Sequence, residues 1–304
     1  MLPLTQALDL KVSTMRLHLA AAALFSCLGA VLGVAHSADD LSPPKNSIPY
    51  GANTAVGKFA EVNGIKLYYE VYGKGPPLLL LHGNGQSIAD MGYQLKVFAD
   101  RYQVIVVDSR GHGRSGIGGG RLTYEQMADD VDALLQLLNV KSVYVLGWSD
   151  GGNVGLLLAM SHPEKVAKLA VMGAILHPDG AYDWALRWLS KEEVRVTSMI
   201  SEGGSTKALE IYKQQLDLLG TQPNISVEQL SRLPMPVLVM AGDKDVIRDD
   251  HTLKIFHAIP NAHLAIFPGA THFMPWQAPT LFNETVETFF RVPFVRPETQ
   301  TLLD

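Results

Sequence analysis

The stretch that decides the fold is VYVLGWSDGGNVGLLLAM, residues 143–160. Its apolar start predicts a buried strand, its Gly-x-Ser-x-Gly centre predicts a sharp turn, and its apolar remainder predicts a helix. Glycines on either side of Ser149 allow strand and helix to approach closely, while the serine takes up a strained backbone conformation. We therefore expect the Ser149 hydroxyl to lie at a helix N-terminus, where the backbone N–H of Asp150 can help to bind an oxyanion.

Strand-length apolar runs alternate with helical patterns on both sides of this stretch. The expected strands are 78–81, 104–107, 168–174, 236–241 and 264–267, and the expected helices are 91–99, 124–138, 252–258 and 280–290. A β-hairpin around Asn63-Gly64 precedes them. Repeated strand–helix units predict an α/β fold with a doubly wound, mostly parallel sheet and helices on both faces.

One interval, residues 176–233, lacks any strand pattern and contains only helical pieces, at 184–189, 192–200 and 206–219. Such an insertion after a sheet strand predicts a helical cap over the site. The expected organisation is a signal peptide at 1–37, a linker at 38–56, an α/β core formed by 57–175 with 234–292, the cap at 176–233, and a C-terminal tail at 293–304.

The N-terminus has the pattern of an export signal. Lys11 and Arg16 precede an almost uncharged apolar run at 17–34, and polar residues follow Ser37. We expect cleavage after Ser37 and delivery to the periplasm or the exterior, with Met15 as an alternative start. An uncleaved membrane anchor and a lipoprotein modified at Cys27 remain as alternatives.

Composition excludes several classes of partner. The formal net charge is −5 and there is no basic stripe, so no nucleic-acid partner is expected. Cys27 is the only cysteine, and no His-Glu-x-x-His spacing occurs, so we expect neither metal nor cofactor. Residues 111–116 fit Gly-x-Gly-x-x-Gly, but a glycine-rich loop at 118–120 stands where a phosphate-binding helix would begin.

A serine hydroxyl needs a base and an orienting acid to become a nucleophile. Asp245 follows one expected strand, and His272 lies on the loop after the last expected strand. The chain order Ser149, Asp245, His272 is that of a known serine-hydrolase triad. Asp243 is the alternative acid.

An oxyanion is stabilised by preorganised backbone donors. Asn84, after His82-Gly83, and Asp150 are the expected pair, with Gly85 as an alternative donor. Substrate-side positions are expected at His82, Trp148 and Asp150 and, in the cap, at Trp184 and Trp188. Further cap candidates are Met199, Tyr212 and Leu216.

Together, the motifs at 82–85, 108–115, 147–151, 242–245 and 269–272 resemble those of the α/β-hydrolase superfamily, over about residues 59–291. The resemblance implies attack by Ser149, an acyl-enzyme, and hydrolysis of that acyl-enzyme by water activated through His272. We expect the substrate to be a small or medium carboxylic ester. Serine at 149 argues against the dehalogenases and epoxide hydrolases of this fold, which carry aspartate there. C–C bond hydrolases, lactonases and cofactor-free haloperoxidases share the triad, and a non-catalytic binding module on this scaffold is the alternative of another class.

The form Gly-Trp-Ser-Asp-Gly-Gly is similar to that of the valacyclovir hydrolase-like branch, whose substrates are esters of α-amino acids. In that branch the acidic residue after the nucleophile faces the substrate amine. The resemblance therefore makes Asp150 a candidate amine-binding residue, alongside the alternative that it is paired or solvated.

Overall fold

The computed structural model describes residues 45, 47–296 and 299. The expected signal peptide, with its anchor and lipoprotein alternatives, lies outside the described residues. Residues 297, 298 and 300–304 of the expected C-terminal tail also lie outside them. None of the helices in the described part combines the length and apolar character that a bilayer crossing requires.

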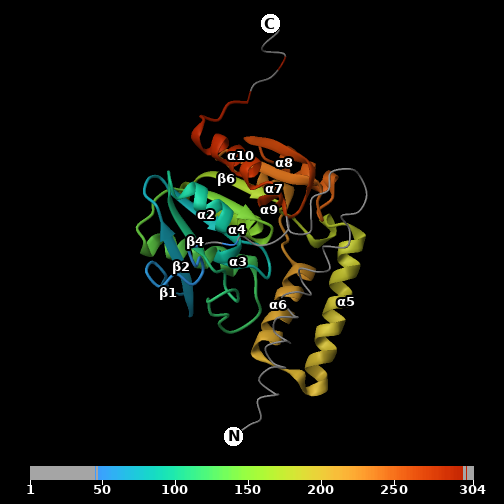
Figure 1. Ribbon diagram of the computed structural model, residues 1–304. Helices are drawn as coiled ribbons and strands as arrows, with labels where there is room; N and C mark the ends of the chain where they lie inside the picture. The colour runs from blue at the N-terminus through green and yellow to red at the C-terminus, as the bar shows by residue number, and fades with distance from the viewer. Residues whose placement is uncertain (1–44, 46, 297–298, 300–304) are drawn as a thin grey trace. The chain divides into compact units, whose positions relative to one another are not determined.

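A single eight-stranded sheet forms the centre of the described chain (Figure 1). The strands are β1 Lys58–Val62, β2 Ile65–Tyr72, β3 Pro77–Leu81, β4 Gln103–Val107, β5 Val143–Trp148, β6 Val166–Met172, β7 Val237–Lys244 and β8 Ala262–Thr271. Their order is β1-β2-β4-β3-β5-β6-β7-β8; β2 pairs antiparallel with β1 and with β4, and all other pairs are parallel. The predicted mostly parallel sheet is confirmed, as is the hairpin, where Asn63 and Gly64 both have positive φ between β1 and β2.

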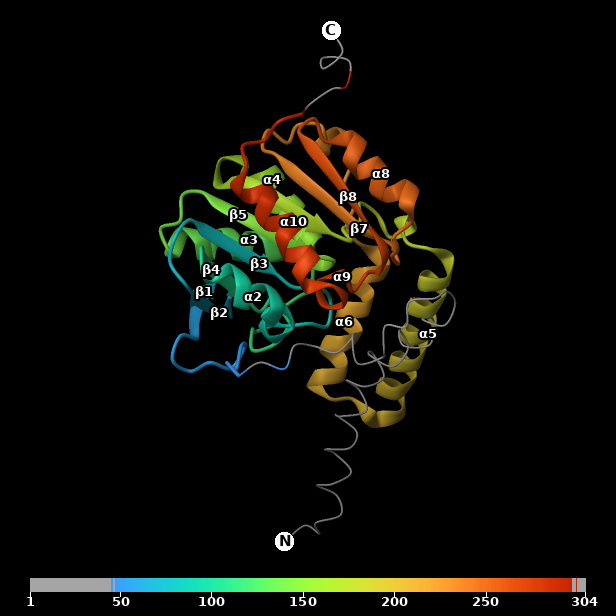
Figure 2. The ribbon, with the colours of Figure 1, turned by 45° about the horizontal axis from the view of Figure 1, so that its top comes forward.

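Helices cover both faces of this sheet (Figures 1 and 2). The first face is covered by α3 Tyr124–Leu137, α4 Asp150–Ser161 and α8 Asp249–Ala258, and the second by α2 Gly92–Phe98, α9 Met274–Gln277 and α10 Pro279–Arg291. Alternate residues of β3 point to opposite faces, Leu79 and Leu81 into one buried cluster and Leu78 and Leu80 into the other. Both faces of this strand are buried, which explains its uninterrupted apolar sequence.

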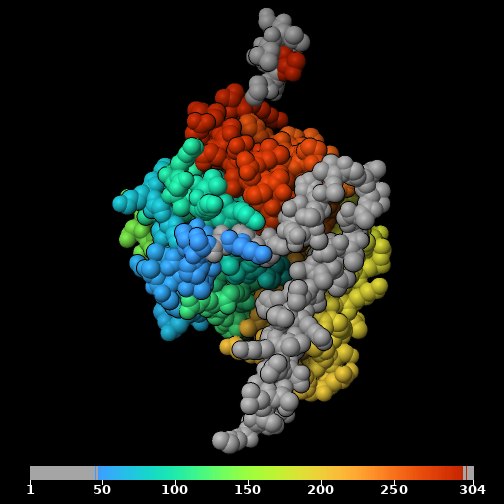
Figure 3. Space-filling model, viewed as in Figure 1, coloured from blue at the N-terminus to red at the C-terminus, as the bar shows by residue number. Residues whose placement is uncertain are grey.

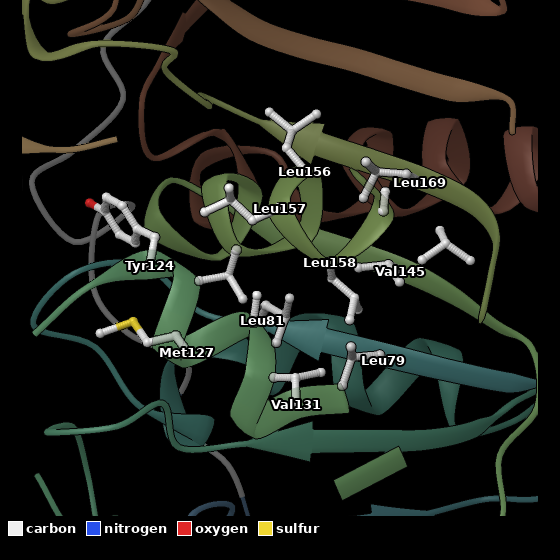
Figure 4. Close-up of a cluster of buried hydrophobic side chains, with 14 of the residues drawn as sticks. Leu79, Leu81, Tyr124, Met127, Val131, Val145, Leu156, Leu157, Leu158 and Leu169 are labelled. Atoms are coloured by element: carbon white, nitrogen blue, oxygen red, sulfur yellow. The ribbon is translucent and has the colours of Figure 1, made fainter. Parts of the chain in front are cut away.

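Figure 4 shows the cluster between the sheet and helices α3 and α4. Strand side chains from β3, β5 and β6 meet residues of both helices there: Leu79, Leu81, Val145, Leu169, Tyr124, Met127, Val131, Leu156, Leu157 and Leu158. Helix α3 begins where predicted, because the Thr123 hydroxyl accepts a hydrogen bond from the Gln126 N–H. This packing fixes α4, and so fixes the turn that precedes it.

On the second face, elements far apart in sequence lie side by side. Gln94 of α2 donates to Asn283 of α10 across 3.2 Å, and Arg101 pairs with Glu287 at 2.9 Å. The space-filling view accordingly places the red C-terminal segment against the cyan and green surface of α2 and its surroundings (Figure 3). The last helix thereby closes this side of the sheet.

Strands β7 and β8 extend further than the sequence predicts. The expected ends at residues 241 and 267 are wrong, because pairing continues to Lys244 and Thr271. The register shifts between Gly242 and Lys244, and a Cβ at Gly242 would lie 2.2 Å from the Ala270 carbonyl oxygen. A glycine here permits close pairing instead of ending the strand, so Asp245 and His272 each follow directly on a strand end.

The interval between β6 and β7 is helical, as predicted. It contains α5 Asp183–Met199, a π-helical segment Ile200–Gly204, α6 Lys207–Thr221 and α7 Val227–Leu230. Figures 1 and 2 show α5 and α6 side by side as a helical hairpin. The pieces expected at 184–189 and 192–200 form one helix, because the intervening Ser190 and Lys191 are compatible with helix. The division into core and cap stays a prediction.

Candidate active site

The elbow after β5 places Ser149 in a conformation that non-glycine residues rarely adopt, with φ 56° and ψ −118°. A Cβ at Gly147 would lie 2.2 Å from the Gly151 carbonyl oxygen, and a Cβ at Gly151 would lie 2.2 Å from the Leu81 carbonyl oxygen. The Ser149 N–H donates to the Met172 carbonyl at 2.7 Å. Close packing of β3, β5, β6 and α4 thus holds the serine at the helix start.

The imidazole of His272 lies between an alcohol and a carboxylate. Its Nε2 is 2.9 Å from Ser149 Oγ and its Nδ1 is 2.7 Å from Asp245 Oδ1. The Asp245 side chain is fully buried and also accepts from the Ile247 N–H at 3.1 Å. With Nδ1–H donating to the carboxylate, Nε2 is left as the acceptor facing the serine.

Burial lowers the pKa of His272, but the charge and hydrogen bond of Asp245, together with the charge of Asp150, outweigh it and raise the pKa above its usual value. Asp243, the alternative acid, instead accepts from the Gly269 N–H at 3.0 Å. Of the two aspartates, the structure therefore brings Asp245 to His272.

Two supports of His272 were not foreseen from the sequence. The Trp148 indole N–H donates to the His272 backbone carbonyl at 2.8 Å, and Trp148 is only 1% exposed. Gly173, after β6, has φ 63°, and a Cβ there would lie 2.6 Å from His272 Cε1. Trp148 therefore holds the histidine loop from beneath instead of lining the substrate site, and Gly173 leaves room for the imidazole ring.

The loop after β3 approaches the elbow. A Cβ at Gly83 would lie 3.2 Å from Ser149 Cβ, and the Gly83 N–H donates to Gln86 Oε1 at 2.7 Å. No acceptor for the Asn84 backbone N–H is found in the described part of the chain. The Asp150 N–H is the first of α4 and has no acceptor inside the helix. These are the two donors predicted for the oxyanion.

His82 stands behind this loop. It is 1% exposed, its Nδ1 lies 2.8 Å from the Gly83 carbonyl oxygen, and its Nε2 accepts from the Ser109 N–H at 3.0 Å. Burial lowers its pKa to about 3. A neutral, fully bonded imidazole ties two loops together, so the structure does not place His82 where a substrate would contact it.

The carboxylate of Asp150 is buried, at 4% exposure, next to the nucleophile. Its Oδ1 accepts from the Tyr124 hydroxyl at 2.7 Å and its Oδ2 from Asn84 Nδ2 at 2.9 Å. Burial raises the pKa of Asp150 to about 6, although both hydrogen bonds act in the opposite direction. No lysine or arginine among the described residues forms an ion pair with it.

The expected cap residues fall into two groups. Trp188, Met199, Tyr212 and Leu216 pack around a buried cluster between α5 and α6. Trp184 is 38% exposed near the start of α5. The first group therefore serves hairpin packing, which is the ordinary use of apolar residues at helical spacing.

The remaining motif, residues 111–116, forms a tight loop around a buried carboxylate. Asp108 accepts from the Arg114 N–H at 2.7 Å and the Ile88 N–H at 2.8 Å, and burial raises its pKa to about 6.

Among the residues that the structure describes, no cluster of histidine, cysteine, aspartate and glutamate is arranged to hold a metal ion.

Comparison with known proteins gives the family. Residues 76–198 match the model of the alpha/beta hydrolase fold family. The protein named putative carbamate hydrolase RutD from Azorhizobium caulinodans is 27% identical over 257 residues, covering 76% of this chain and 97% of that protein. Serine hydrolase BPHL from Homo sapiens is 28% identical over 258 residues, covering 80% of this chain and 88% of that protein.

Among solved structures, Est816, described as an N-acyl homoserine lactone degrading enzyme, is 26% identical with a TM-score of 0.63. The match covers 76% of this chain and all of that one. Fold, elbow and relatives agree, and the chain is a member of the α/β-hydrolase superfamily.

Proposed function

We propose that this hydrolase cleaves a small or medium carboxylic ester through an acyl-enzyme on Ser149. The observation that carries the proposal is the imidazole of His272 held between Ser149 Oγ and the buried Asp245 carboxylate. A serine hydroxyl needs an adjacent base to become a nucleophile near neutral pH, and the carboxylate holds that base in the required tautomer.

In the first step His272 Nε2 takes the proton of Ser149 Oγ as the oxygen attacks the ester carbonyl carbon. The imidazolium that forms is stabilised by the Asp245 carboxylate. Negative charge then develops on the carbonyl oxygen, and we assign the N–H groups of Asn84 and Asp150 as its donors.

When the tetrahedral intermediate collapses, the C–O bond to the alcohol breaks and His272 returns its proton to the departing oxygen. A water molecule then gives its proton to His272 and attacks the acyl carbon. Collapse of the second intermediate releases the acid and restores the Ser149 hydroxyl.

The test is a panel of p-nitrophenyl esters of graded acyl length, measured with the wild type and with Ser149→Ala. The relatives' names supply two further arms, a carbamate and an N-acyl homoserine lactone. We expect ester kcat/KM to exceed that of both other arms and to vanish in Ser149→Ala. Higher kcat/KM for lactone or carbamate would refute the ester assignment, and turnover by Ser149→Ala would refute the role of the serine.

A narrower substrate class is favoured by the Asp150 carboxylate, which accepts two hydrogen bonds from neutral groups but has no lysine or arginine partner among the described residues. A buried anion without a basic partner is stabilised by a cation, and a substrate amine would supply one. An aminoacyl ester is therefore expected to outperform its des-amino analogue, and Asp150→Ala is expected to abolish that preference. Equal kcat/KM for the two esters would refute this narrower proposal and leave the ester assignment intact.

A further inference from the structure

The side-chain amide of Asn84 joins three elements that are distant in sequence. Asn84 lies on the loop after β3; its Nδ2 donates to Asp150 Oδ2, at the start of α4, across 2.9 Å. The same nitrogen donates to the Gln215 backbone carbonyl, in α6, across 3.2 Å. One amide group thus links the loop after β3, called the oxyanion loop from here on, to the elbow and to the α5–α6 hairpin.

Chemistry fixes the orientation of this amide. A carboxylate and a carbonyl are both acceptors, so only the NH₂ end of Asn84 can face them, and its two hydrogens are both used. A hydrogen bond to a carboxylate is about twice as strong as one between neutral groups. The side chain is therefore held at two points in one conformation.

The loop is already held at the peptide bond before Asn84, because the Gly83 carbonyl oxygen accepts from the Gln86 N–H at 3.3 Å and lies 2.8 Å from His82 Nδ1. Gly83 and Gly85 flank the residue, and Gly85 has φ 66°. Gln86 fixes the Gly83 N–H, but no hydrogen bond in the described part of the chain holds the N–H of Asn84 itself. The anchored side chain adds a second restraint, on the Asn84 side of that peptide bond.

The α6 end of the link is itself docked. The Gln215 side chain is 7% exposed and donates to the Gly111 carbonyl at 2.9 Å, and the neighbouring Gln214 accepts from the Leu122 N–H at 3.3 Å. The carbonyl that Asn84 contacts therefore moves only if α6 shifts against the loops at 111–122.

We propose that Asn84 is a positioning residue whose side chain, together with the contacts of the Gly83 carbonyl, aims its own backbone N–H at the oxyanion and couples that donor to the docking of α6. The inference rests on the proposed function. Donors that are set before reaction stabilise charge that exists only in the transition state, so loss of aim lowers kcat and leaves ground-state binding unchanged.

The test compares Asn84→Ala and Asn84→Asp with Asn224→Ala. Asn224 is exposed and donates only to the local Thr221 carbonyl at 3.2 Å, so it is a matched control. We expect kcat to fall roughly 10- to 100-fold in both Asn84 variants with KM within about 2-fold. Inhibition by a trifluoromethyl ketone matching the acyl chain should weaken by the same factor as kcat falls.

The dependence on α6 is tested by a double-mutant cycle. Gln215→Ala removes the bond to Gly111 and keeps the backbone carbonyl, so we expect a smaller loss of kcat that does not add to that of Asn84→Ala. Unchanged kcat in both Asn84 variants, or a rise in KM alone, would overturn the positioning role, and additive losses would overturn the link to α6. If the wild type hydrolyses no ester, the proposed function itself is refuted. Tm values and active-site titration identify any variant that has failed to fold.

Discussion

Two carboxylates, Asp245 and Asp150, raise the pKa of His272. Substitution of a single residue can therefore shift this pKa, and a pH profile measures the shift. The base must be neutral to accept the serine proton, so kcat/KM falls as the pH drops through the His272 pKa. That pKa lies above the usual value, so the acid limb of wild type is expected above pH 6.5.

Asp150→Asn removes one of these anions and keeps the size of the side chain. The imidazolium loses a stabilising charge, so the His272 pKa falls and the acid limb of kcat/KM moves to lower pH. The measurement is a pH profile with a substrate that does not titrate in this range. A limb that stays in place or moves to higher pH contradicts the assigned electrostatics.

Gly173 supports the histidine by having no side chain. Gly173→Ala would place a carbon 2.6 Å from His272 Cε1 and 2.7 Å from Nδ1, so we expect kcat/KM to fall about 100-fold as the ring is displaced. Gly64→Ala is the control, because Gly64 also has positive φ, 77°, with nothing within 4 Å of the added carbon. We expect Tm to fall by a similar amount in both variants, and activity to fall only in Gly173→Ala. Equal activities of the two variants would show that the imidazole ring has room for the added carbon.

Individual residues differ in how far the sequence reveals them. Ser149, Asp245 and His272 stand in local motifs whose order along the chain carries information, and the structure brings their side chains together. Gly173 and Tyr124 gain their positions at the site through tertiary packing alone, since no local pattern relates them to residues 272 and 150. Trp148 precedes the nucleophile in sequence, and this adjacency predicted a place at the substrate site. In the structure its side chain instead packs in the buried cluster on the sheet face covered by α2, α9 and α10.

At the scale of elements, apolar periodicity predicted every central strand and most helices, whereas the ends required structure. Strands β7 and β8 continue through glycines because partner strands, invisible to a local pattern, supply their hydrogen bonds. Helix α5 is continuous because its middle polar residues are compatible with helix and its apolar residues pack against α6.

The α5–α6 hairpin offers a matched pair of substitutions on one helix. Val196 is fully buried in the hairpin cluster, whereas Val194 is 67% exposed. We expect Val196→Ala to lower the free energy of opening of the hairpin by about 2 kcal/mol, from two lost carbon atoms and a residual cavity, and Val194→Ala to change it by less than about 0.5 kcal/mol. Amide hydrogen exchange in α5 and α6 measures both, and equal effects would contradict the packing described.

At the scale of the whole molecule, the N-terminal pattern supports a proposal about the fate of the chain. We propose that residues 1–37 direct export and are removed, because a basic start, an apolar run and Ala35-His36-Ser37 before Ala38 match the pattern of a signal peptide. Expression of the full chain in a bacterium should yield an exported protein that begins at Ala38. An intact N-terminus in the membrane fraction would instead support the anchor.

The fold also accounts for how distant residues meet. His272 lies 123 positions from Ser149 and 27 from Asp245, yet parallel strands β5, β7 and β8 all end at the same edge of the sheet. Ligand sites of open α/β sheets lie at this edge, which is why the topology predicted from sequence was sufficient to expect the three residues together. The contacts of α6 with the oxyanion loop depend on the docking of a hairpin and could not be read from any motif.

The central claim is that Ser149 carries the acyl group, and rapid quenching with peptide mass spectrometry tests it most directly. Wild type mixed with excess p-nitrophenyl acetate and acid-quenched within milliseconds should show one acetyl group on the peptide containing Ser149, formed as fast as p-nitrophenol is released and lost as acetate appears. Hydrolysis without that adduct, or an adduct on another residue that turns over at the rate of the reaction, would contradict the account.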